Sequence, residues 1–355
     1  MKKILPAVAV VALGLVGCNQ QPVQKMNEVQ VIGSHNSYKQ FIDTHLLSMM
    51  VSENPDAKSL EYDNTSLSDQ LSLGLRNLEI DVYADAKGGK FSKPGGLEWA
   101  GKDPQRPYDP DNLMVEPGLK VLHMQDLDFR SSCLTLKNCL AELKSWSAAH
   151  PAHEPVYITM NAKDDTVAKP GFSPPEKFTA EVLKELDKTI RAEMGNEKLV
   201  TPDLVRGKYN TLEEAVLAKN WPSLKDAAGK FVFILDEKNE KRDAYIDGNP
   251  SLTGRVLFVN APAGSPSAAI MIMNDPLKEK DQIQSLVRKG YIVRTRADAE
   301  TKEARANDKT RFNAACESGA QIITTDYYQK STLFNSPYAI SFEDGKYIRK
   351  NPLMK

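Results

Sequence analysis

Eight short apolar runs, spread along 355 residues, constrain the fold of this chain more than any other feature. Each run has the length of a buried strand, and helical patterns lie between several of them. Strands that alternate with helices predict a parallel sheet, and a count of eight favours a closed TIM-type (β/α)8 barrel. The expected strands are 30–33, 75–82, 120–124, 155–160, 231–235, 255–260, 291–295 and 321–325. The expected helices are 67–73, 136–149, 176–194, 211–218, 277–289 and 303–318.

The first 17 residues are predicted to be a secretion signal. Two lysines precede an apolar stretch, residues 4–16, that is too short to be a stable transmembrane helix. The LVGC sequence that ends at Cys18 is similar to the lipobox of bacterial lipoproteins, in which this cysteine becomes the lipidated N-terminus. We therefore expect an exported lipoprotein, held in the cell envelope by a membrane anchor. Residues 18–28 would form the lipidated tether, and residues 29–355 would form one barrel domain.

Charge and cysteine usage narrow the possible partners and the compartment. Because 46 basic residues balance 47 acidic ones, nothing suggests nucleic acid as a partner, and no feature predicts a protein partner. In an exported protein, Cys133 and Cys139 are close enough in sequence to form a local disulfide. Cys316 lies in a helical pattern and is expected to be a buried free thiol.

A long insertion follows the second expected strand. Residues 85–118 are rich in glycine and proline, and a loop of this length in a compact domain is usually functional or disordered. In a barrel, this loop would leave the carboxyl-terminal rim, which is where barrel enzymes carry their active sites. We expect it to lie over the site.

Polar side chains lie at the ends of the first two expected strands. His35 and Asn36 follow the first strand directly. Glu79 and Asp81 alternate within the second strand, so both carboxylates point to one face. Two like charges inside a barrel are costly unless a cation or base neutralises them.

The third and fourth expected strands continue this pattern. His123 ends the third, and Asn161 and Lys163 follow the fourth. Because parallel strands end at one rim, these side chains are expected to meet. Carboxylate and amide oxygens suit Ca²⁺, and Mg²⁺ less well, rather than zinc. A histidine at a strand end is also a common structural residue, and the two carboxylates would also be satisfied by Arg76 or Lys163.

The ordered motifs resemble the X-region of phosphatidylinositol-specific phospholipases C. The wider pattern is similar to the bacterial calcium-dependent phosphoinositide phospholipase C-like family, over residues 30–328. The motifs are GSHNSY at 33–38, LEIDV at 78–82 and VLH at 121–123 followed by Asp128, with later matches at 146–155, 293–298 and 318–327.

This resemblance implies a barrel that cleaves phosphodiesters, in which a substrate hydroxyl attacks phosphorus. His35 would stabilise the pentavalent phosphoryl group or protonate the leaving group, and His123 would be its partner in acid–base work or charge stabilisation. The ligands implied for Ca²⁺ are Asn36, Glu79, Asp81 and Asn161. At Asn161 the chain departs from the family pattern, which has a glutamate there, so we expect weaker calcium binding.

Four further residues are candidates for substrate binding. Lys163 would bind phosphate or an inositol hydroxyl, or else pair with Glu79 or Asp164. Arg294 and Arg296 alternate on one expected strand and would anchor phosphate, or else form ion pairs with Asp298 or Asp326. Tyr327 would stack on a sugar ring, or else pack at the rim.

The leading interpretation is a lipid-anchored, calcium-dependent phosphodiesterase of the phospholipase C type. One alternative is a glycerophosphodiester phosphodiesterase, which shares the barrel and the metal-assisted use of two histidines. The other is a catalytically degenerate barrel retained as a surface lipid- or sugar-binding protein. The presence of both His35 and His123 argues against that last class, since a binding module does not need both.

Overall fold

The computed structural model of this chain describes residues 23–101, 106–167 and 171–354. The expected signal segment and Cys18, the expected lipidation site, lie outside the described residues. Within the described ranges, no helix has both the length and the apolar character needed to cross a bilayer.

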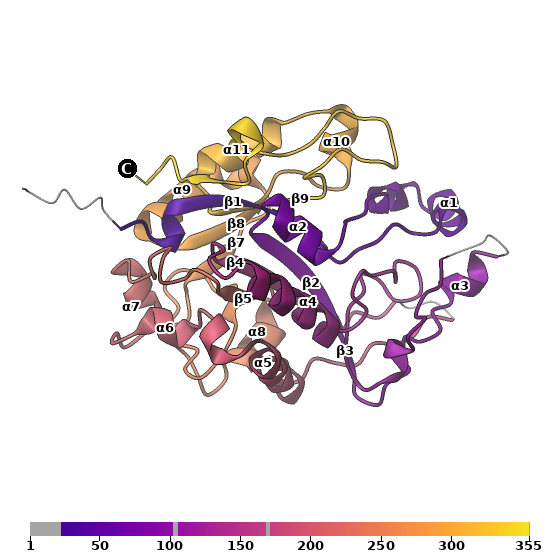
Figure 1. Ribbon diagram of the computed structural model, residues 1–355, viewed down its shortest axis with the longest axis horizontal. Helices are drawn as coiled ribbons and strands as arrows, with labels where there is room; N and C mark the ends of the chain where they lie inside the picture. Colours follow the sequence, from indigo (N-terminus) through magenta and orange to yellow (C-terminus); the bar gives the residue numbers. More distant parts are fainter. Residues whose placement is uncertain (1–22, 102–105, 168–170, 355) are drawn as a thin grey trace, which may run out of the picture.

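Eight parallel strands form a nearly closed barrel, as the alternating pattern predicted (Figure 1). Around the barrel the order is β6-β5-β4-β2-β1-β9-β8-β7, and a parallel bridge between Asn260 and Ile270 joins its two ends. The strands are β1 (Val29–Ser34), β2 (Asn77–Asp85), β4 (Val156–Ala162), β5 (Phe231–Leu235), β6 (Phe258–Val259), β7 (Ile270–Ile272), β8 (Ile292–Arg296) and β9 (Ile322–Thr325).

The expected strand at residues 120–124 was wrong as a barrel strand. Only β3 (Gly118–Lys120) forms there, and it pairs antiparallel with the end of β2, outside the barrel. The true eighth strand, β7, was missed because three residues carry no readable periodicity. His123 therefore lies in the loop after β3. A second antiparallel strand, β10 (Ile348–Lys350), pairs with β1.

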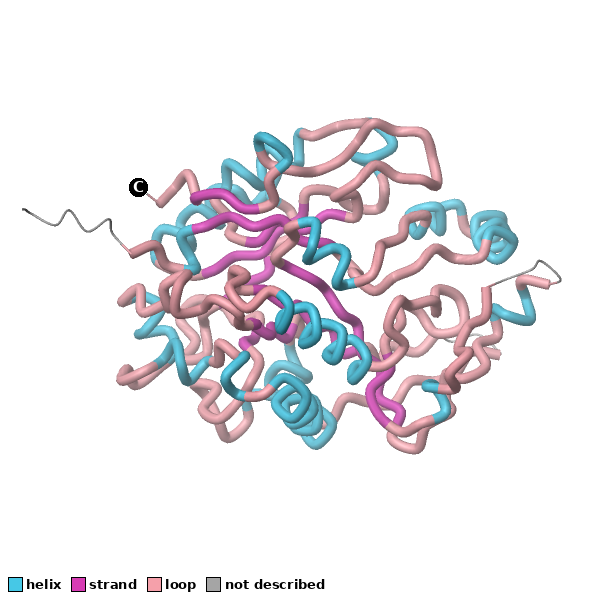
Figure 2. The backbone as a smooth tube through the Cα atoms, in the orientation of Figure 1, coloured by secondary structure: helices cyan, strands magenta, loops and turns pink. Residues whose placement is uncertain are grey.

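Helices surround the barrel, as Figure 2 shows in cyan. Two of them, α2 and α4, have the bounds expected from the sequence, whereas the helix expected at 303–318 divides into α10 and α11. The α-helices are α1 (Thr44–Glu53), α2 (Leu67–Leu73), α3 (Gly96–Trp99), α4 (Leu136–Ala149), α5 (Ala180–Met194), α6 (Pro202–Arg206), α7 (Leu212–Leu217), α8 (Asn239–Ile246), α9 (Pro276–Lys289), α10 (Lys302–Ala306) and α11 (Thr310–Ser318).

Helix α4 illustrates how the sequence specifies these elements. The Thr135 hydroxyl caps its first turn by accepting a hydrogen bond from the Asn138 amide at 3.2 Å. Leu136, Leu140 and Leu143 recur at helical spacing and are buried in the main core. The helix therefore begins where a cap is available and packs its apolar face against the barrel.

The folded domain begins earlier than predicted. Residues expected to form the end of the tether instead build the short 3₁₀ helix η1 (Met26–Glu28). Met26 is fully buried, and its amide donates to the Pro222 carbonyl at 3.1 Å. The Gln24 carbonyl accepts from the Leu224 amide at 2.9 Å. Gln24 and Met26 therefore belong to the barrel domain, because their backbone groups pair with it.

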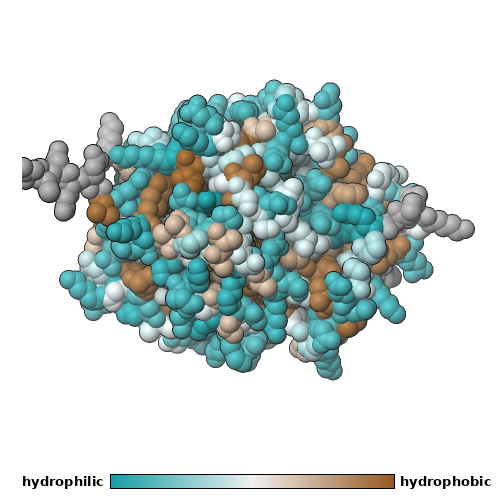
Figure 3. Space-filling view, in the orientation of Figure 1, coloured by the Kyte–Doolittle hydropathy of each residue, from teal (hydrophilic) through white to brown (hydrophobic). Residues whose placement is uncertain are grey.

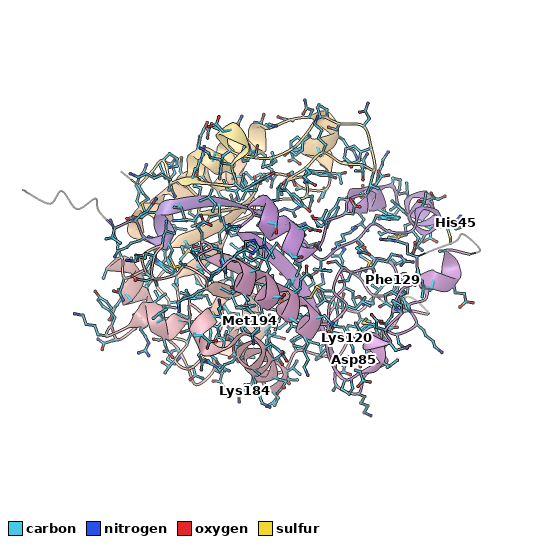
Figure 4. All side chains as sticks on the ribbon, in the orientation of Figure 1. His45, Asp85, Lys120, Phe129, Lys184 and Met194 are labelled. Carbon is cyan, nitrogen blue, oxygen red and sulfur yellow. A yellow bond between two sulfur atoms is a disulfide. The ribbon has the colours of Figure 1, made fainter. Side chains whose placement is uncertain are left out.

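The insertion follows β2, as expected. It contains α3 and the 3₁₀ helix η3 (Leu113–Val115), ends where β3 begins, and lies at the same end of the molecule as α1 (Figure 1). At its base, Asp85 and Lys120 lie close together, with 4.0 Å between Oδ2 and Nζ (Figure 4). Both side chains are almost completely buried, and the pairing of β3 with β2 holds the two ends of the insertion together.

A disulfide joins Cys133 and Cys139, the pair that the sequence indicated, with 5.2 Å between their Cα atoms. It connects the segment after β3 to the first turns of α4. Cys316, a free thiol, is only partly buried.

Replacing both cysteines, in Cys133→Ala/Cys139→Ala, should lower the free energy of unfolding by about 2 kcal/mol, because the unfolded chain regains the freedom of a short loop. Urea unfolding of the oxidised proteins measures this, with Cys316→Ala as the control. Equal stability of all three proteins would contradict a stabilising disulfide.

Candidate active site

The predicted site residues meet where the strands of the barrel end. The register of β2 against β4 places Asp81 opposite Asn161 and Glu79 opposite Thr159. His35 and Asn36 follow β1, the other neighbour of β2. The alternation in β2 therefore points both carboxylates into the barrel, as predicted.

The turn after β1 is held tightly against β2. At Gly33 a side chain is excluded, since a Cβ atom there would lie 2.4 Å from the Asn77 Cβ. Ser37 then bonds the Glu79 backbone twice, because its hydroxyl accepts from the Glu79 amide at 2.7 Å and its own amide donates to the Glu79 carbonyl at 2.9 Å. Asn36, between them, has a left-handed φ of 45°. The geometry fixes His35 beside the Glu79 side chain.

His35 lies between two carboxylates and keeps 18% of its side chain exposed. Its Nδ1 lies 2.7 Å from Asp326 Oδ1, and its Nε2 lies 3.6 Å from Glu79 Oε1. Arg296 donates to the other oxygen of Asp326 at 3.1 Å. Burial, reinforced by the Arg296 charge, holds the pKa of His35 well below its ordinary value. At neutral pH the imidazole is therefore uncharged and can accept a proton.

His123 has a carboxylate partner of its own. Its Nδ1 lies 2.7 Å from Asp128 Oδ2, and Asp128 also lies 3.4 Å from Lys39 Nζ. The Asp128 and Lys39 side chains are fully buried, whereas His123 keeps 17% of its side chain exposed. Lys39 belongs to the segment after β1 that carries His35, so its contact with Asp128 links the two histidine-bearing segments. The site thus holds two histidines, each oriented by a buried carboxylate.

The two carboxylates of β2 converge on the side-chain amide of Asn161. Its Nδ2 donates to Glu79 Oε1 at 3.0 Å and to Asp81 Oδ1 at 2.8 Å. The remaining Glu79 oxygen accepts from the Arg294 guanidinium, and the remaining Asp81 oxygen lies 3.6 Å from Lys163 Nζ. Two negative charges are therefore balanced by two positive ones.

This donor set fits a calcium ion. Two carboxylate oxygens already point at one position, and carboxylates with amide oxygens are the ligands that Ca²⁺ takes. Asn161 would complete the set by turning its side chain so that the oxygen replaces the NH₂ group. Asn36 uses its NH₂ group to donate to Tyr62 Oη at 2.7 Å, an orientation that suits its Oδ1 as a ligand. No group of three or more His, Cys, Asp or Glu forms a metal cluster in the described part of the chain, because two of the expected ligands are amides.

The substrate-binding candidates lie in different surroundings. Lys163 is 29% exposed and pairs with Asp81 rather than with Glu79 or Asp164. Arg296 pairs with Asp326, one of the expected partners, whereas Arg294 pairs with Glu79. Tyr327 is 3% exposed and packs edge-to-face on Phe334 and Tyr338, which favours its structural interpretation.

Sequence reasoning missed part of the site. Asp326 was considered only as an ion-pair partner, yet it faces His35. Its position directly after β9 is the signal that identifies it. Asp298 accepts hydrogen bonds from the Asp326 amide and the Thr325 hydroxyl behind this pair. Burial and the nearby Asp326 charge raise the pKa of Asp298 to about 7. Asn274, which bonds Arg294, follows the missed strand β7.

Two oriented histidines beside convergent carboxylates, at the rim of a barrel, are groups that a metal-assisted acid–base hydrolase requires. Within that class, the chain belongs to the calcium-dependent phosphoinositide phospholipase C family, whose sequence model matches residues 24–352. This membership makes the protein a phosphoric diester hydrolase of the phospholipase C type, in a calcium-dependent family.

Solved structures share the fold. A calcium-dependent phosphoinositol-specific phospholipase C from Pseudomonas sp., in a myoinositol complex, has a TM-score of 0.54 and 17% identity over 92% of this chain and 95% of that one. A Ca²⁺-dependent phosphatidylinositol-specific phospholipase C from Streptomyces antibioticus has a TM-score of 0.55 and 19% identity, over 86% and 95% respectively. Among curated proteins, no sequence matches significantly.

Removing the Arg294 guanidinium, in Arg294→Met, should cost about 3 kcal/mol of unfolding free energy, since Glu79 then keeps a buried charge without its main cation. Chemical denaturation in chelator measures this. Arg242→Met removes a surface ion pair with Asp243 and should cost less than about 1 kcal/mol. Adding Glu79→Gln to Arg294→Met should recover part of the lost unfolding free energy. Equal losses in Arg294→Met and Arg242→Met would refute the role of Arg294 in neutralising Glu79.

Proposed function

We propose that this protein is a calcium-dependent phospholipase C that cleaves a phosphoinositide or a related phosphodiester. The observation that carries the proposal is the pair of histidine–carboxylate contacts at one rim, His35 with Asp326 and His123 with Asp128, each at 2.7 Å. Two separately oriented imidazoles supply the base and the acid that phosphodiester cleavage needs.

The two histidines take different roles in the proposed reaction. His35, held neutral, accepts the proton of the substrate hydroxyl as its oxygen attacks phosphorus. Asp326 orients His35 and stabilises the imidazolium that forms. His123 donates a proton to the leaving oxygen, so that a new P–O bond forms as the old one breaks and the leaving group departs as an alcohol.

The metal ligands are proposed to be Asn36, Glu79, Asp81 and Asn161. Calcium, when bound there, lowers the pKa of the attacking hydroxyl and offsets phosphate charge. Lys163 is the best placed of the cationic candidates to contact the phosphate, because it is more exposed than Arg294 and Arg296. The two arginines instead hold Glu79 and Asp326 in position.

The proposal includes export and anchoring. The LVGC sequence ending at Cys18 supports a lipidated N-terminus, and the fold beginning near Gln24 leaves a short tether after it. Such a tether would hold the barrel close to a membrane that contains its substrate.

Each of the variants His35→Ala and His123→Ala should lower turnover of phosphatidylinositol in detergent micelles by at least about 100-fold, because each removes one proton-transfer group. Release of water-soluble inositol phosphate is the measurement. His45, exposed on α1, provides the control, and His45→Ala should keep wild-type activity (Figure 4). Full activity of either site variant would remove the catalytic assignment.

Calcium affinity should rise when the missing carboxylate is supplied. In Asn161→Glu, a third negative charge faces the position where Glu79 and Asp81 converge, so calorimetric titration should show tighter binding than in wild type. Asn161→Gln, which adds length without charge, is the matched control. If Asn161→Glu bound calcium no more tightly than wild type, the ion would have to bind at another position.

A further inference from the structure

A pocket of about 800 Å³ opens beside the catalytic rim, between α1, the 3₁₀ helix η2 (Pro55–Leu60) and the insertion. Its volume falls within the range of pockets that bind small ligands. Figure 3 shows brown, apolar surface among teal residues at this end of the molecule, where Figure 1 places α1 and α3. The apolar lining includes Leu46, Met49, Met50, Trp99, Met124 and Phe172.

The pocket shares a wall with the His123 turn. Met124 and Asp128 bond each other's backbone in both directions at 3.0 Å, so this tight turn carries both His123 and part of the lining. Asp126, at the tip of the turn, is 2% exposed. Its carboxylate accepts from the Gly95 amide at 2.8 Å and from the Ser173 amide at 2.6 Å. These bonds tie the Trp99 and Phe172 walls to the catalytic turn.

The chemistry of the lining indicates what it can hold. The charged residues among the described lining, Glu53 and Asp56, are both acidic, so this lining offers no cation to attract a phosphate. Methionine side chains adapt to irregular apolar ligands, and three of them line the pocket. Its position beside His123, the proposed donor to the leaving oxygen, places it on the leaving-group side of the reaction.

We propose that this pocket binds an acyl chain of the lipid substrate, so that the enzyme recognises the apolar leaving group as well as the headgroup. The inference rests on the proposed function, which orients the bound lipid with its diacylglycerol moiety on the His123 side. The occupant is one acyl chain of a single lipid molecule, and insertion of this rim into a bilayer is the competing outcome.

Kinetics with monomeric substrates test the proposal. Each methylene moved from water into an apolar pocket strengthens binding by up to about fourfold. For the full chain, the KM of dihexanoyl phosphatidylinositol, below its micellar concentration, should be lower than that of the dibutyryl lipid by about fivefold to tenfold. In Met49→Glu the two lipids should have equal KM values, and the cleavage of glycerophosphoinositol should be unchanged. Leu277→Glu, on an exposed apolar position of α9, is the matched control.

A binding measurement separates this inference from the proposed function. Trp99 lines the pocket, whereas Trp146 and Trp221, the other two tryptophans, are buried in the main core. Monomeric dihexanoylglycerol with bromine at its chain ends should quench wild-type fluorescence but not that of Trp99→Phe. Quenching without any phosphodiester cleavage would refute the function and keep the acyl site. Cleavage without Trp99 quenching, or a chain-length ratio unchanged in Met49→Glu, would overturn the acyl site.

Discussion

The site depends on how the charges of Glu79 and Asp81 are balanced inside the barrel. Each carboxylate gives one oxygen to the Asn161 amide, and the other oxygens face Arg294 and Lys163. Without these partners, two buried negative charges on one strand would be strongly destabilising. In the proposed calcium site, the same balance would limit the attraction for a divalent cation, since two positive side chains already neutralise the carboxylates. The proposal therefore makes one group of contacts responsible both for stability without metal and for affinity for metal.

A second constraint is the rigid placement of the histidines. His35 is held because Gly33 and Ser37 bring the turn after β1 against β2, and His123 is held by a hairpin-like turn outside the barrel. Each imidazole meets a buried carboxylate. For His35 this is Asp326, which is distant in the sequence, and for His123 it is Asp128, which lies in the same turn. Because Asp126 in the same turn also secures the insertion, the rim that carries the two histidines and the apolar pocket form one connected structure.

Much of this arrangement was predictable from local patterns. Alternation in β2 identified Glu79 and Asp81, and the strand–helix pattern predicted the barrel. The strand expected at 120–124 was wrong because an apolar run reads the same whether it enters a barrel or an outer hairpin. The contact of Asp326 with His35 spans almost the whole chain and depends on barrel closure, so no local pattern encodes it. The sequence placed Asn161 after the fourth expected strand, but its hydrogen bonds to both carboxylates depend on the register of β2 against β4.

The most direct test is to identify the phosphorylated product by phosphorus NMR. Phosphatidylinositol and glycerophosphoinositol would be incubated with the protein, once with calcium and once with chelator. The account predicts a cyclic or acyclic inositol phosphate, with diacylglycerol released from the lipid, in the calcium sample alone. Glycerol 3-phosphate as the product would instead indicate a glycerophosphodiester phosphodiesterase, and no turnover of either substrate with calcium would indicate a binding protein. Either result would contradict the assignment of this barrel as a phospholipase C.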